Sequence, residues 1–349
     1  MEASFSKYTL NFKRASGTSR GVLKLKETWF IILRDGNRNG IGECGMFKGL
    51  SCDDRPDFEE KLKWACQNIG LGLGSLLDNL NEFPSIQFGL EMAFKSFESN
   101  NPFELFPSRF TKSEDYIAIN GLIWMGDKGF MKSQIEEKIR AGFSCIKMKI
   151  GAIDFSAEIE LLNYIRQEFT PSDIELRVDA NGAFKANDAL EKLKRLSDFD
   201  LHSIEQPIRQ GQFEAMAELC EKTPLPIALD EELIGVFLKE KKKALLAQIN
   251  PQYIILKPTL IGGFKGSMEW IDTAENQDIG WWITSALESN VGLNAISQFT
   301  YKLKNPLPQG LGTGALFTNN FDSPLQVKNG KLHYDFKDGW SLENDSFKF

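Results

Sequence analysis

The chain has 349 residues, a net charge of −7 and an apolar share of 42%. This length allows about two domains of roughly 150 residues, and the apolar share is ordinary for a globular protein. Lysine and arginine form no block or stripe, which argues against nucleic-acid binding, and no apolar run reaches the roughly 18–20 residues of a bilayer span. The N-terminus, MEASFSKYTLNFKR, lacks the apolar stretch of a secretory signal, so we expect a cytoplasmic protein.

Cysteine and histidine usage narrows the chemistry further. The five cysteines fit neither a CxxC site nor a disulfide framework, and the only histidines are His202 and His333. We expect the cysteines to be reduced and mostly buried. Acid–base chemistry must then depend on carboxylates, lysines or tyrosines, because a histidine cluster is not available.

The chain up to residue 112 predicts a small α+β capping domain. Segments near 5–13, 22–34 and 40–44 carry β-type patterning, and the turn DGNRNG (35–40) joins the last two as a hairpin. Helical patterning follows near 57–72 and 84–99.

From about Tyr116 onward, short apolar β-type runs recur, each followed by a helical stretch. The eight runs are YIAIN (116–120), CIKMKI (145–150), IELRVDA (174–180), HSIEQP (202–207), PIALDE (226–231), YIILKP (253–258), WWITSA (281–286) and QGLGTG (309–314). Eight alternating units of this length predict an α/β fold with a (β/α)8-type barrel over 113–319. A doubly wound open sheet is the alternative, weakened because no GxGxxG opens a helix after any run. We expect the tail, 320–349, to return to the capping domain.

Ionisable side chains stand at the ends of five consecutive runs, where such barrels place their active sites. The second to sixth runs carry, in order, Lys147 and Lys149; Arg177, Asp179 and Asn181; Glu205; Asp230 with Glu231; and Lys257. Residues two apart on a strand share a face, so these side chains can converge on one cavity. Each residue alone also fits a cap, a turn or an inner-barrel salt bridge, but five charged ends in consecutive order are hard to explain as capping.

The acidic residues of this set predict a metal site. Asp179, Glu205 and Asp230 follow one another at intervals of 26 and 25 residues, about one βα unit each, which places them on three adjacent strands. Three anionic oxygens with open positions suit Mg²⁺, with Mn²⁺ able to substitute, better than Zn²⁺, which favours His or Cys ligands. Lys149 and Lys257 flank these strands. A lysine beside a cation and partly desolvated should have a lowered pKa and can act as a base.

These motifs resemble the enolase superfamily, in its muconate-lactonizing subgroup. The matching segments are KMK (147–149), RVDANGAF (177–184), IEQP (204–207), ALDEE (228–232) and ILKP (255–258). Enzymes of this superfamily pair a Lys or His base with magnesium to stabilise an ene-diolate. The resemblance implies that the three acidic residues bind Mg²⁺, that Lys149 removes the α-proton and returns it to the departing hydroxyl, and that Lys257 supports the enolate from the other face.

Three further segments resemble the o-succinylbenzoate synthase family within that subgroup: TSRGVLKLKETWFI (18–31), GECGMF (42–47) and SALESNVGLNAIS (285–297). The implied reaction is syn loss of water from 2-succinyl-6-hydroxy-2,4-cyclohexadiene-1-carboxylate, a small anionic substrate, in menaquinone biosynthesis. A capping loop with Ser19 and Arg20 would close over the substrate. The implied substrate contacts are Lys147, Arg177, Asn181, Ser285 and Gly312.

Two other functions remain open. A racemase or epimerase acting on N-succinylamino acids or dipeptides would use the same lysine pair. Dipeptide epimerases carry an acidic DxD at the eighth run, which GTGALF (312–317) lacks, whereas N-succinylamino acids share the succinyl tail. A non-catalytic metal-binding barrel would have no reason to keep both lysines. The pattern leaves the oligomeric state open.

Overall fold

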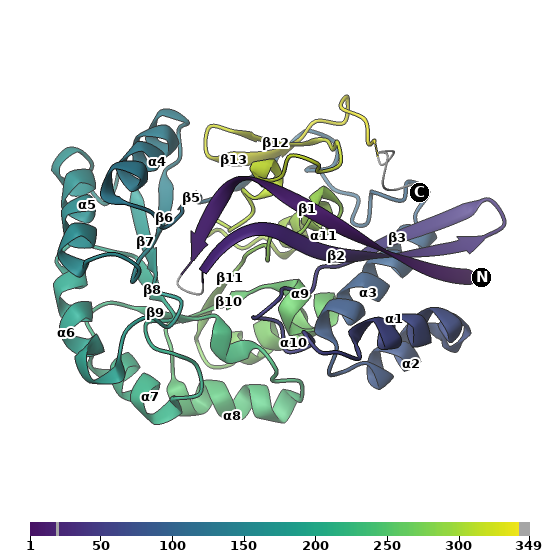
Figure 1. Ribbon diagram of the computed structural model, residues 1–349, viewed down its shortest axis with the longest axis horizontal. Coiled ribbons are helices and arrows are strands. Elements are labelled where there is room, and N and C mark those ends of the chain that lie inside the picture. Colours follow the sequence, from purple (N-terminus) through teal and green to yellow (C-terminus); the bar gives the residue numbers. More distant parts are fainter. Residues whose placement is uncertain (19–20, 342–349) are drawn as a thin grey trace.

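A computed structural model describes residues 1–18 and 21–341 of the chain (Figure 1). The N-terminal sheet is antiparallel, with the order β1 (Glu2–Thr18), β2 (Gly21–Asp35), β3 (Arg38–Cys44). The predicted turn between β2 and β3 is a two-residue hairpin loop, since Asp35 pairs with Arg38. Gly36 takes a φ of +56°, a conformation that glycine adopts without steric cost.

Four helical segments follow this sheet: α1 (Phe58–Gln67), the 3-10 turn η1 (Ile69–Leu71), α2 (Gly72–Asn79) and α3 (Pro84–Glu98). Helix α3 packs directly on β3, and two glycines allow the close approach. A Cβ on Gly42 would lie 1.8 Å from the Gly89 carbonyl oxygen, and one on Gly89 would lie 2.3 Å from Cys44 Sγ. Larger residues at either position would push the helix off the sheet.

The remainder of the chain forms a curled parallel sheet wrapped by helices, which confirms the predicted barrel-type α/β class. Its seven strands run in sequence order: β5 (Gly121–Ile123), β6 (Cys145–Lys149), β7 (Glu175–Asp179), β8 (Ser203–Glu205), β9 (Ile227–Leu229), β10 (Tyr253–Leu256) and β11 (Gly280–Ile283). The strands are short and buried on both faces, as expected where helices cover one side and barrel contents the other.

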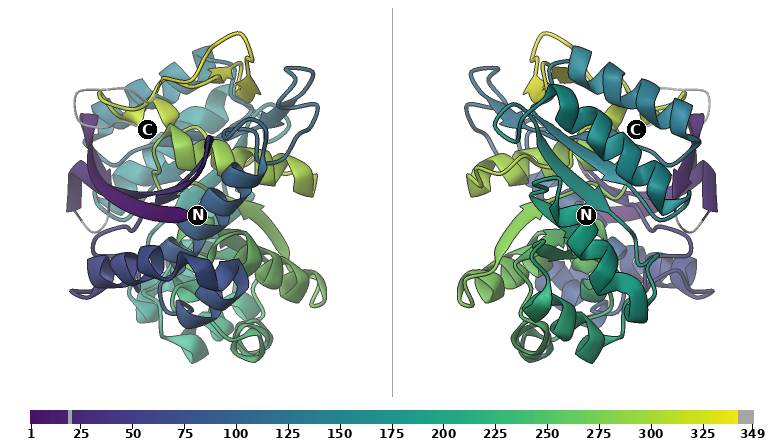
Figure 2. Two further views of the ribbon diagram at one scale, coloured as in Figure 1. Left: turned by 90° about the vertical axis from the view of Figure 1, so that its right-hand side faces the viewer. Right: turned by 90° about the vertical axis from the view of Figure 1, so that its left-hand side faces the viewer.

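A helix follows each of these strands. The connecting helices are α4 (Lys128–Arg140), α5 (Phe155–Glu168), α6 (Ala186–Ser197), α7 (Phe213–Lys222), α8 (Lys239–Ile249), α9 (Pro258–Ile261) with α10 (Gly263–Glu275), and α11 (Asn290–Leu303). Short 3-10 turns, η2 (Glu231–Leu233) and η3 (Gly314–Leu316), lie in the loops. Figure 2 shows α5 to α7 on the side of the barrel away from the N-terminal sheet.

The first and eighth runs differ from the sequence-based prediction. Tyr116–Ala118 forms β4 outside the barrel, and the first barrel strand is β5. QGLGTG forms no strand, but Gln309 bridges Ile119 and Gly310 bridges Thr284, both in parallel. Prolines at 306 and 308 and glycines at 310, 312 and 314 disfavour an extended ladder, so the barrel closes through a two-residue seam.

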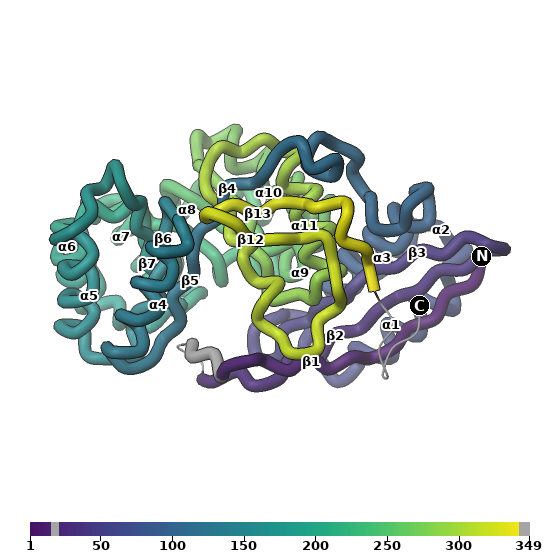
Figure 3. Tube along the Cα trace, turned by 90° about the horizontal axis from the view of Figure 1, so that it is seen from above, coloured from purple at the N-terminus to yellow at the C-terminus, as the bar shows by residue number. Residues whose placement is uncertain are grey.

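The C-terminal segment contacts both parts of the chain. The hairpin β12 (Leu325–Lys328) and β13 (Lys331–Tyr334) pairs with β4. Seen from above, this hairpin lies between the barrel helices and the N-terminal strands (Figure 3). Just before it, the Phe321 ring lies 5.1 Å from the Tyr8 ring of β1. The boundaries 1–112, 113–319 and 320–349 remain our proposal for the domain division.

Two buried glutamates from the N-terminal part bind the N-termini of barrel helices. Glu91 on α3 accepts hydrogen bonds from the backbone N–H groups of Phe264, at 2.5 Å, and Lys265, at 3.0 Å, at the start of α10. Glu43 on β3 accepts from the backbone N–H of Ser289 and Gly292 at the start of α11. A carboxylate satisfies the unpaired N–H groups of a helix start and complements its dipole, so each contact fixes the cap on the barrel.

No helix in the two described stretches has the length and apolar character needed to cross a lipid bilayer.

Candidate active site

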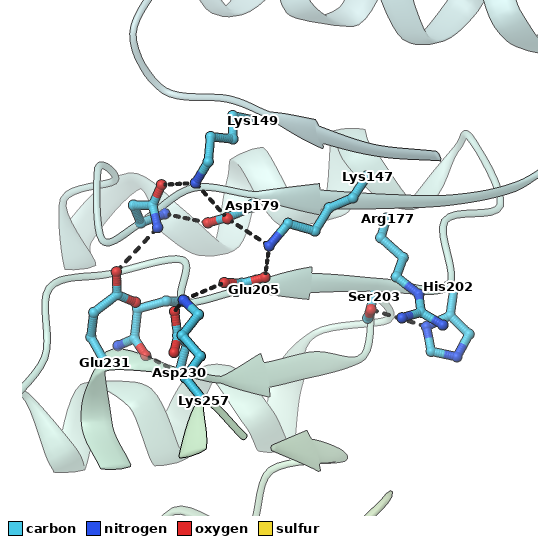
Figure 4. Close-up of polar contacts among 12 residues, drawn as sticks. Lys147, Lys149, Arg177, Asp179, His202, Ser203, Glu205, Asp230, Glu231 and Lys257 are labelled. Atoms are coloured by element: carbon cyan, nitrogen blue, oxygen red, sulfur yellow. Dashed lines mark hydrogen bonds and ion pairs between the residues drawn. The ribbon is translucent and has the colours of Figure 1, made fainter. Parts of the chain in front are cut away.

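The charged strand ends meet at one end of the barrel (Figure 4). Lys149 on β6, Asp179 on β7 and Glu205 on β8 are direct neighbours in the parallel register. Asp230 directly follows β9, and Lys257 directly follows β10, at the same carboxyl edge of the sheet. The register therefore brings together five side chains that the chain spreads over more than a hundred residues.

Ammonium and carboxylate groups alternate along this row. Lys149 Nζ and Lys147 Nζ each lie 2.9 Å from Asp179 Oδ2. Lys147 Nζ also donates to Glu205 Oε2. Each carboxylate is thus linked to the next through a lysine, which limits repulsion between the buried acids.

The row continues through Lys257 on the other side of Glu205. Lys257 Nζ lies 3.8 Å from Glu205 Oε1 and donates to Asp230 Oδ2. Burial alone would lower the pKa of Lys257, but Asp230 and Glu205 outweigh it and raise that pKa.

The charge balance shifts the pKa values of the central groups in opposite directions. Burial would lower the pKa of Lys147, but the carboxylates of Asp179 and Glu205 raise it. Burial would raise the pKa of Asp179, but Lys147 and its neighbouring lysines hold it below the ordinary range. Burial and the Asp179 charge raise the pKa of Glu205.

The three carboxylates suit a divalent cation in their chemistry. All are almost fully buried, and Glu205 Oε1 has no hydrogen-bond donor. As they stand, no three His, Cys, Asp or Glu side chains in residues 1–18 and 21–341 are grouped closely enough to hold an ion. The reason is visible in the row: the ammonium groups of Lys147 and Lys257 lie between the acids, so ion binding requires them to release carboxylate oxygens.

Two residues in left-handed backbone conformations turn the chain away just after the acids. Asn181 has a φ of +45° and Gln206 a φ of +40°. Gln206 Oε1 accepts from the backbone N–H of Asp230, at 3.2 Å, and of Glu232, at 3.4 Å. Gln206 Nε2 donates to the Ile208 carbonyl at 3.0 Å. Gln206 thus ties the end of β8 to the end of β9 and sets the position of Asp230 relative to Glu205.

Asn181 holds Lys149 on the other side of the row. Its Oδ1 accepts from Lys149 Nζ at 2.7 Å, and its Nδ2 donates to Glu231 Oε1 at 3.1 Å. The Asn181 backbone N–H donates to Asp179 Oδ1 at 3.0 Å. For Glu231 the sequence leaves open a solvated turn residue or a group that supports the site; in the structure it is 2% exposed and part of this network.

A cavity of about 390 Å³ opens beside the row. Seven of the residues singled out in the sequence line it: Lys147, Lys149, Asp179, Asn181, Lys257, Ser285 and Gly312. Glu205, Asp230 and Arg177 are not part of this lining. A Cβ on Gly312 would meet only ordinary contacts at 3.5 Å or more, so the glycine leaves the space to the cavity.

The N-terminal part supplies a second wall that sequence reasoning missed. Lys13, Arg14 and Leu23 of the β1–β2 hairpin line the cavity, as do Phe47 and Leu50 of the loop after β3. The segment GECGMF, which ends at Phe47, was the one sequence feature that pointed to this wall. The predicted capping-loop residues Ser19 and Arg20 lie outside the described residues.

Ser285 lines the cavity with a hydroxyl group that already has partners. Its Oγ donates to Glu288 Oε2 at 2.5 Å and accepts from Thr313 Oγ1 at 2.9 Å and from the Leu287 N–H at 3.0 Å. Ser285, the predicted substrate contact, is therefore part of a hydrogen-bonded group. Thr313, another member of this group, also lines the cavity.

The substrate-binding role predicted for Arg177 is wrong. Arg177 pairs with Lys147 in the register, one layer below Asp179, and its guanidinium extends away from the row. Arg177 Nε donates to Glu175 Oε1 at 2.7 Å, and the guanidinium lies 4.3 Å from the Trp282 ring. Arg177 is 1% exposed and fills the lower part of the barrel. The inner-barrel salt bridge, considered as the alternative, is what the structure contains.

The geometry is suited to chemistry that builds negative charge. Lys149 at the end of β6 and Lys257 after β10 both line the cavity, on the two strands that flank the three strands carrying the acids. Such fixed charges stabilise an anion without reorganisation, and a lysine that has lost its proton can accept one from carbon.

Comparisons with known proteins agree with this chemistry. The family described as Enolase C-terminal domain-like matches residues 131–348. An o-succinylbenzoate synthase from Desulfotalea psychrophila is 46% identical over 95% of this chain and 98% of its own. A crystal structure of MenC from Desulfotalea psychrophila LSv54 is 43% identical, with a TM-score of 0.85 over 95% of this chain and 99% of the other.

A more distant structure shares the fold. The dipeptide epimerase from Enterococcus faecalis V583, in complex with Mg and the dipeptide L-Leu-L-Tyr, has a TM-score of 0.82 at 17% identity, covering 95% of this chain and 96% of the other. The identity and coverage of the Desulfotalea relative, together with the family match, show that this chain belongs to the enolase superfamily and, within it, to the o-succinylbenzoate synthase family.

Proposed function

We propose that this protein catalyses the syn-dehydration of 2-succinyl-6-hydroxy-2,4-cyclohexadiene-1-carboxylate to 2-succinylbenzoate, a step of menaquinone biosynthesis. One observation carries the proposal: Lys149 and Lys257 both line the cavity, and they come from β6 and from the end of β10, the two strands that flank those ending in Asp179, Glu205 and Asp230. Family membership supports it. The reaction is a hydro-lyase reaction, in which a C–H and a C–O bond break and water leaves.

Enzymes of this superfamily use a divalent metal, and we propose Mg²⁺ here, with Mn²⁺ as a substitute. Asp179, Glu205 and Asp230 would hold the ion, since they offer three anionic oxygen ligands and no His or Cys stands beside them. Glu205 Oε1, buried without a hydrogen-bond donor, supports this assignment. When bound, the ion supplies positive charge that stabilises the developing enolate.

Lys149 is the proposed acid–base residue. As a neutral amine, it removes the proton next to the substrate carboxylate, and as an ammonium it returns that proton to the departing hydroxyl group. Both transfers occur on one face, which gives syn elimination. Asn181 Oδ1 accepts from Lys149 Nζ and so orients it toward the cavity. A base of this kind supplies roughly 10²–10⁴-fold in rate.

Lys257 is the proposed electrostatic partner. Its ammonium group, beside Asp230 and Glu205, would stabilise the enolate from the β10 side of the site. Lys147 and Asn181 line the same cavity and are proposed to contact the substrate, with Ser285 and Gly312 beside the succinyl tail. Lys13 and Arg14 add positive charge on the cap side, which suits a small anionic substrate.

N-succinylamino acid racemisation is the second candidate, because two cavity-lining lysines, Lys149 from β6 and Lys257 after β10, also suit proton transfer on two faces. Dipeptide epimerisation is less favoured. The cavity wall formed by Gly312, Thr313, Ala315 and Leu316 carries no carboxylate to hold an amino group.

Lys149→Ala should abolish dehydration while leaving metal binding intact. We expect turnover to fall at least about 10²-fold, since the variant lacks the base. Absorbance change on aromatisation measures turnover, and calorimetry measures Mg²⁺ affinity. Lys185→Ala, at an exposed lysine before α6, is the control and should behave as wild type. More than a few per cent of residual activity in Lys149→Ala would refute the base assignment.

Metal removal should be reversible. We expect EDTA to abolish turnover and added Mg²⁺, or Mn²⁺ in its place, to restore it, because three buried acids and the substrate carboxylate need a cation. The assay compares the dialysed protein before and after metal addition. A metal-free preparation that still turns over would contradict the assignment of the three acids.

Gln206→Leu should weaken metal binding without touching a proposed ligand. The leucine cannot accept from the Asp230 and Glu232 N–H groups, so Asp230 loses its position, and such supporting groups contribute about 10–100-fold in affinity. Gln212→Leu is the matched control, since that exposed amide donates to the Arg209 carbonyl. Equal Mg²⁺ affinities by calorimetry in the two variants would contradict the role of Gln206.

A further inference from the structure

The seam that closes the barrel brings two polar side chains to the cavity. Thr284, directly after β11, bridges Gly310 in parallel, and the Asn120 backbone N–H donates to the Gln309 carbonyl at 3.0 Å. Thr284, Gly310 and Asn120 are therefore neighbours on three adjacent segments, and all three line the cavity. The acids stand at the ends of the middle three of the seven strands, whereas the seam joins the two outermost strands. The seam therefore lies across the barrel from the acids.

Both side chains point into the barrel. A Cβ on Gly121 would lie 3.1 Å from a side chain of α4, on the outer side of β5. Asn120, its neighbour, therefore points inward, because successive residues of an extended chain face opposite sides. On β11, the Trp282 ring lies inside the barrel, 4.3 Å from the Arg177 guanidinium. Thr284, two residues further on, shares that face.

The polar groups of these two side chains are not used by the fold. Asn120 is only 6% exposed, and Thr284 is partly buried. Within residues 1–18 and 21–341, neither the Asn120 amide nor the Thr284 hydroxyl has a hydrogen-bond partner. A buried amide without a partner destabilises a fold, so such a group at a cavity points to a bound molecule that completes its hydrogen bonds.

Gly310 leaves the space between the two side chains open. A Cβ on Gly310 would lie 2.5 Å from Thr284 Oγ1 and 2.7 Å from Thr284 Cγ2, so the threonine side chain leans over the glycine. The Gly310 backbone is fixed, since its N–H donates to the Ile283 carbonyl at 2.8 Å and its carbonyl accepts from the Ser285 N–H at 3.0 Å. Neighbouring strands lie about 4.8 Å apart, so the Asn120 and Thr284 backbones stand roughly 10 Å apart and their side chains can reach one group between them.

Two other hydroxyl groups of this wall have already donated their hydrogen atoms. Thr313 Oγ1 donates to Ser285 Oγ, and Ser285 Oγ donates to Glu288 Oε2. A hydroxyl has one hydrogen atom, so neither Ser285 nor Thr313 can donate to a bound molecule while these bonds persist. Asn120 and Thr284 still have their donors.

We propose that Asn120 and Thr284 bind the terminal carboxylate of the substrate's succinyl tail, across Gly310. The assignment rests on the proposed function, which supplies the succinyl group and places the ring carboxylate at the acids and lysines of the row. The tail then extends toward the opposite wall, where the seam lies. A carboxylate that leaves water needs hydrogen-bond donors, and these two side chains can donate without giving up another contact.

The test compares the affinity of the full, Mg²⁺-loaded protein for 2-succinylbenzoate and for 2-butanoylbenzoate by calorimetry. The second compound keeps the ring carboxylate and the keto group but carries a methyl group in place of the tail carboxylate. Asn120→Leu and Thr284→Val each remove one donor at similar size. We expect each variant to bind 2-succinylbenzoate about tenfold more weakly or worse, the loss expected for a hydrogen bond to a charged group. Affinity for 2-butanoylbenzoate should stay within about twofold of wild type.

Turnover and stability give two further readouts. KM for the cyclohexadiene substrate should rise about as much as the affinity falls, with kcat changing less than about threefold, because the tail lies away from the reacting atoms. Tm of both variants should be unchanged or higher, since neither side chain loses a partner within the chain. Thr300→Val is the matched control. Thr300 is 3% exposed and donates to the Ile296 carbonyl within α11, outside the cavity lining. This control should lower Tm and leave both affinities unchanged.

Unchanged affinity for 2-succinylbenzoate in both variants would overturn the proposal. Equal losses for the two compounds would also overturn it, because they would place the keto group or the ring at these side chains. A loss confined to Lys13→Met or Arg14→Met would assign the tail carboxylate to the β1–β2 hairpin instead. If Asn120→Leu does not fold, Thr284→Val decides by the same criteria. A wild-type protein that prefers 2-succinylbenzoate but does not dehydrate the cyclohexadiene would refute the proposed function, and the affinities would still decide the tail site.

Discussion

Burial of like charges at the end of the barrel is the constraint on which the rest of this structure depends. Asp179, Glu205 and Asp230 are withdrawn from water, and three buried acids are unstable unless cations stand between them. The ammonium groups of Lys147 and Lys257 are the cations that stand between these acids. A divalent ion held by the three acids would supply the same compensation.

The parallel sheet provides the geometry for this balance. Direct pairing of Lys149 with Asp179 and of Asp179 with Glu205 places the groups one strand apart, so neighbouring lysines and acids come within reach of one another. The left-handed conformations at Asn181 and Gln206 then turn the chain outward, and their amide groups hold Lys149 and Asp230. The cap closes the other side of the cavity, held by Glu91 and Glu43 on helix N-termini.

Much of this arrangement could be predicted from the sequence, because strand alternation and a βα period near 25 residues are local properties. Asp179, Glu205 and Asp230 were placed on adjacent strands by spacing alone. The failures involve non-local effects. Strand alternation predicts on which face of β7 Arg177 lies. It does not predict that the long side chain reaches down to Glu175 and Trp282. The glycines and prolines near Gly310 made an eighth strand too short to form a ladder.

The cap contributions were hidden for a similar reason. Phe47 and Leu50 look like ordinary apolar residues until the loop after β3 is seen to reach the cavity. In the proposed function, these walls would select the substrate, whereas the lysines and acids would carry out the proton abstraction.

The most direct test of the account is an ultraviolet assay of the purified, Mg²⁺-loaded protein with the cyclohexadiene substrate, run beside N-succinylamino acids and dipeptides. The account predicts rapid aromatisation of the cyclohexadiene and, at most, slow racemisation of the N-succinylamino acids. Faster conversion of a dipeptide or an N-succinylamino acid, with no loss of water from the cyclohexadiene, would contradict it.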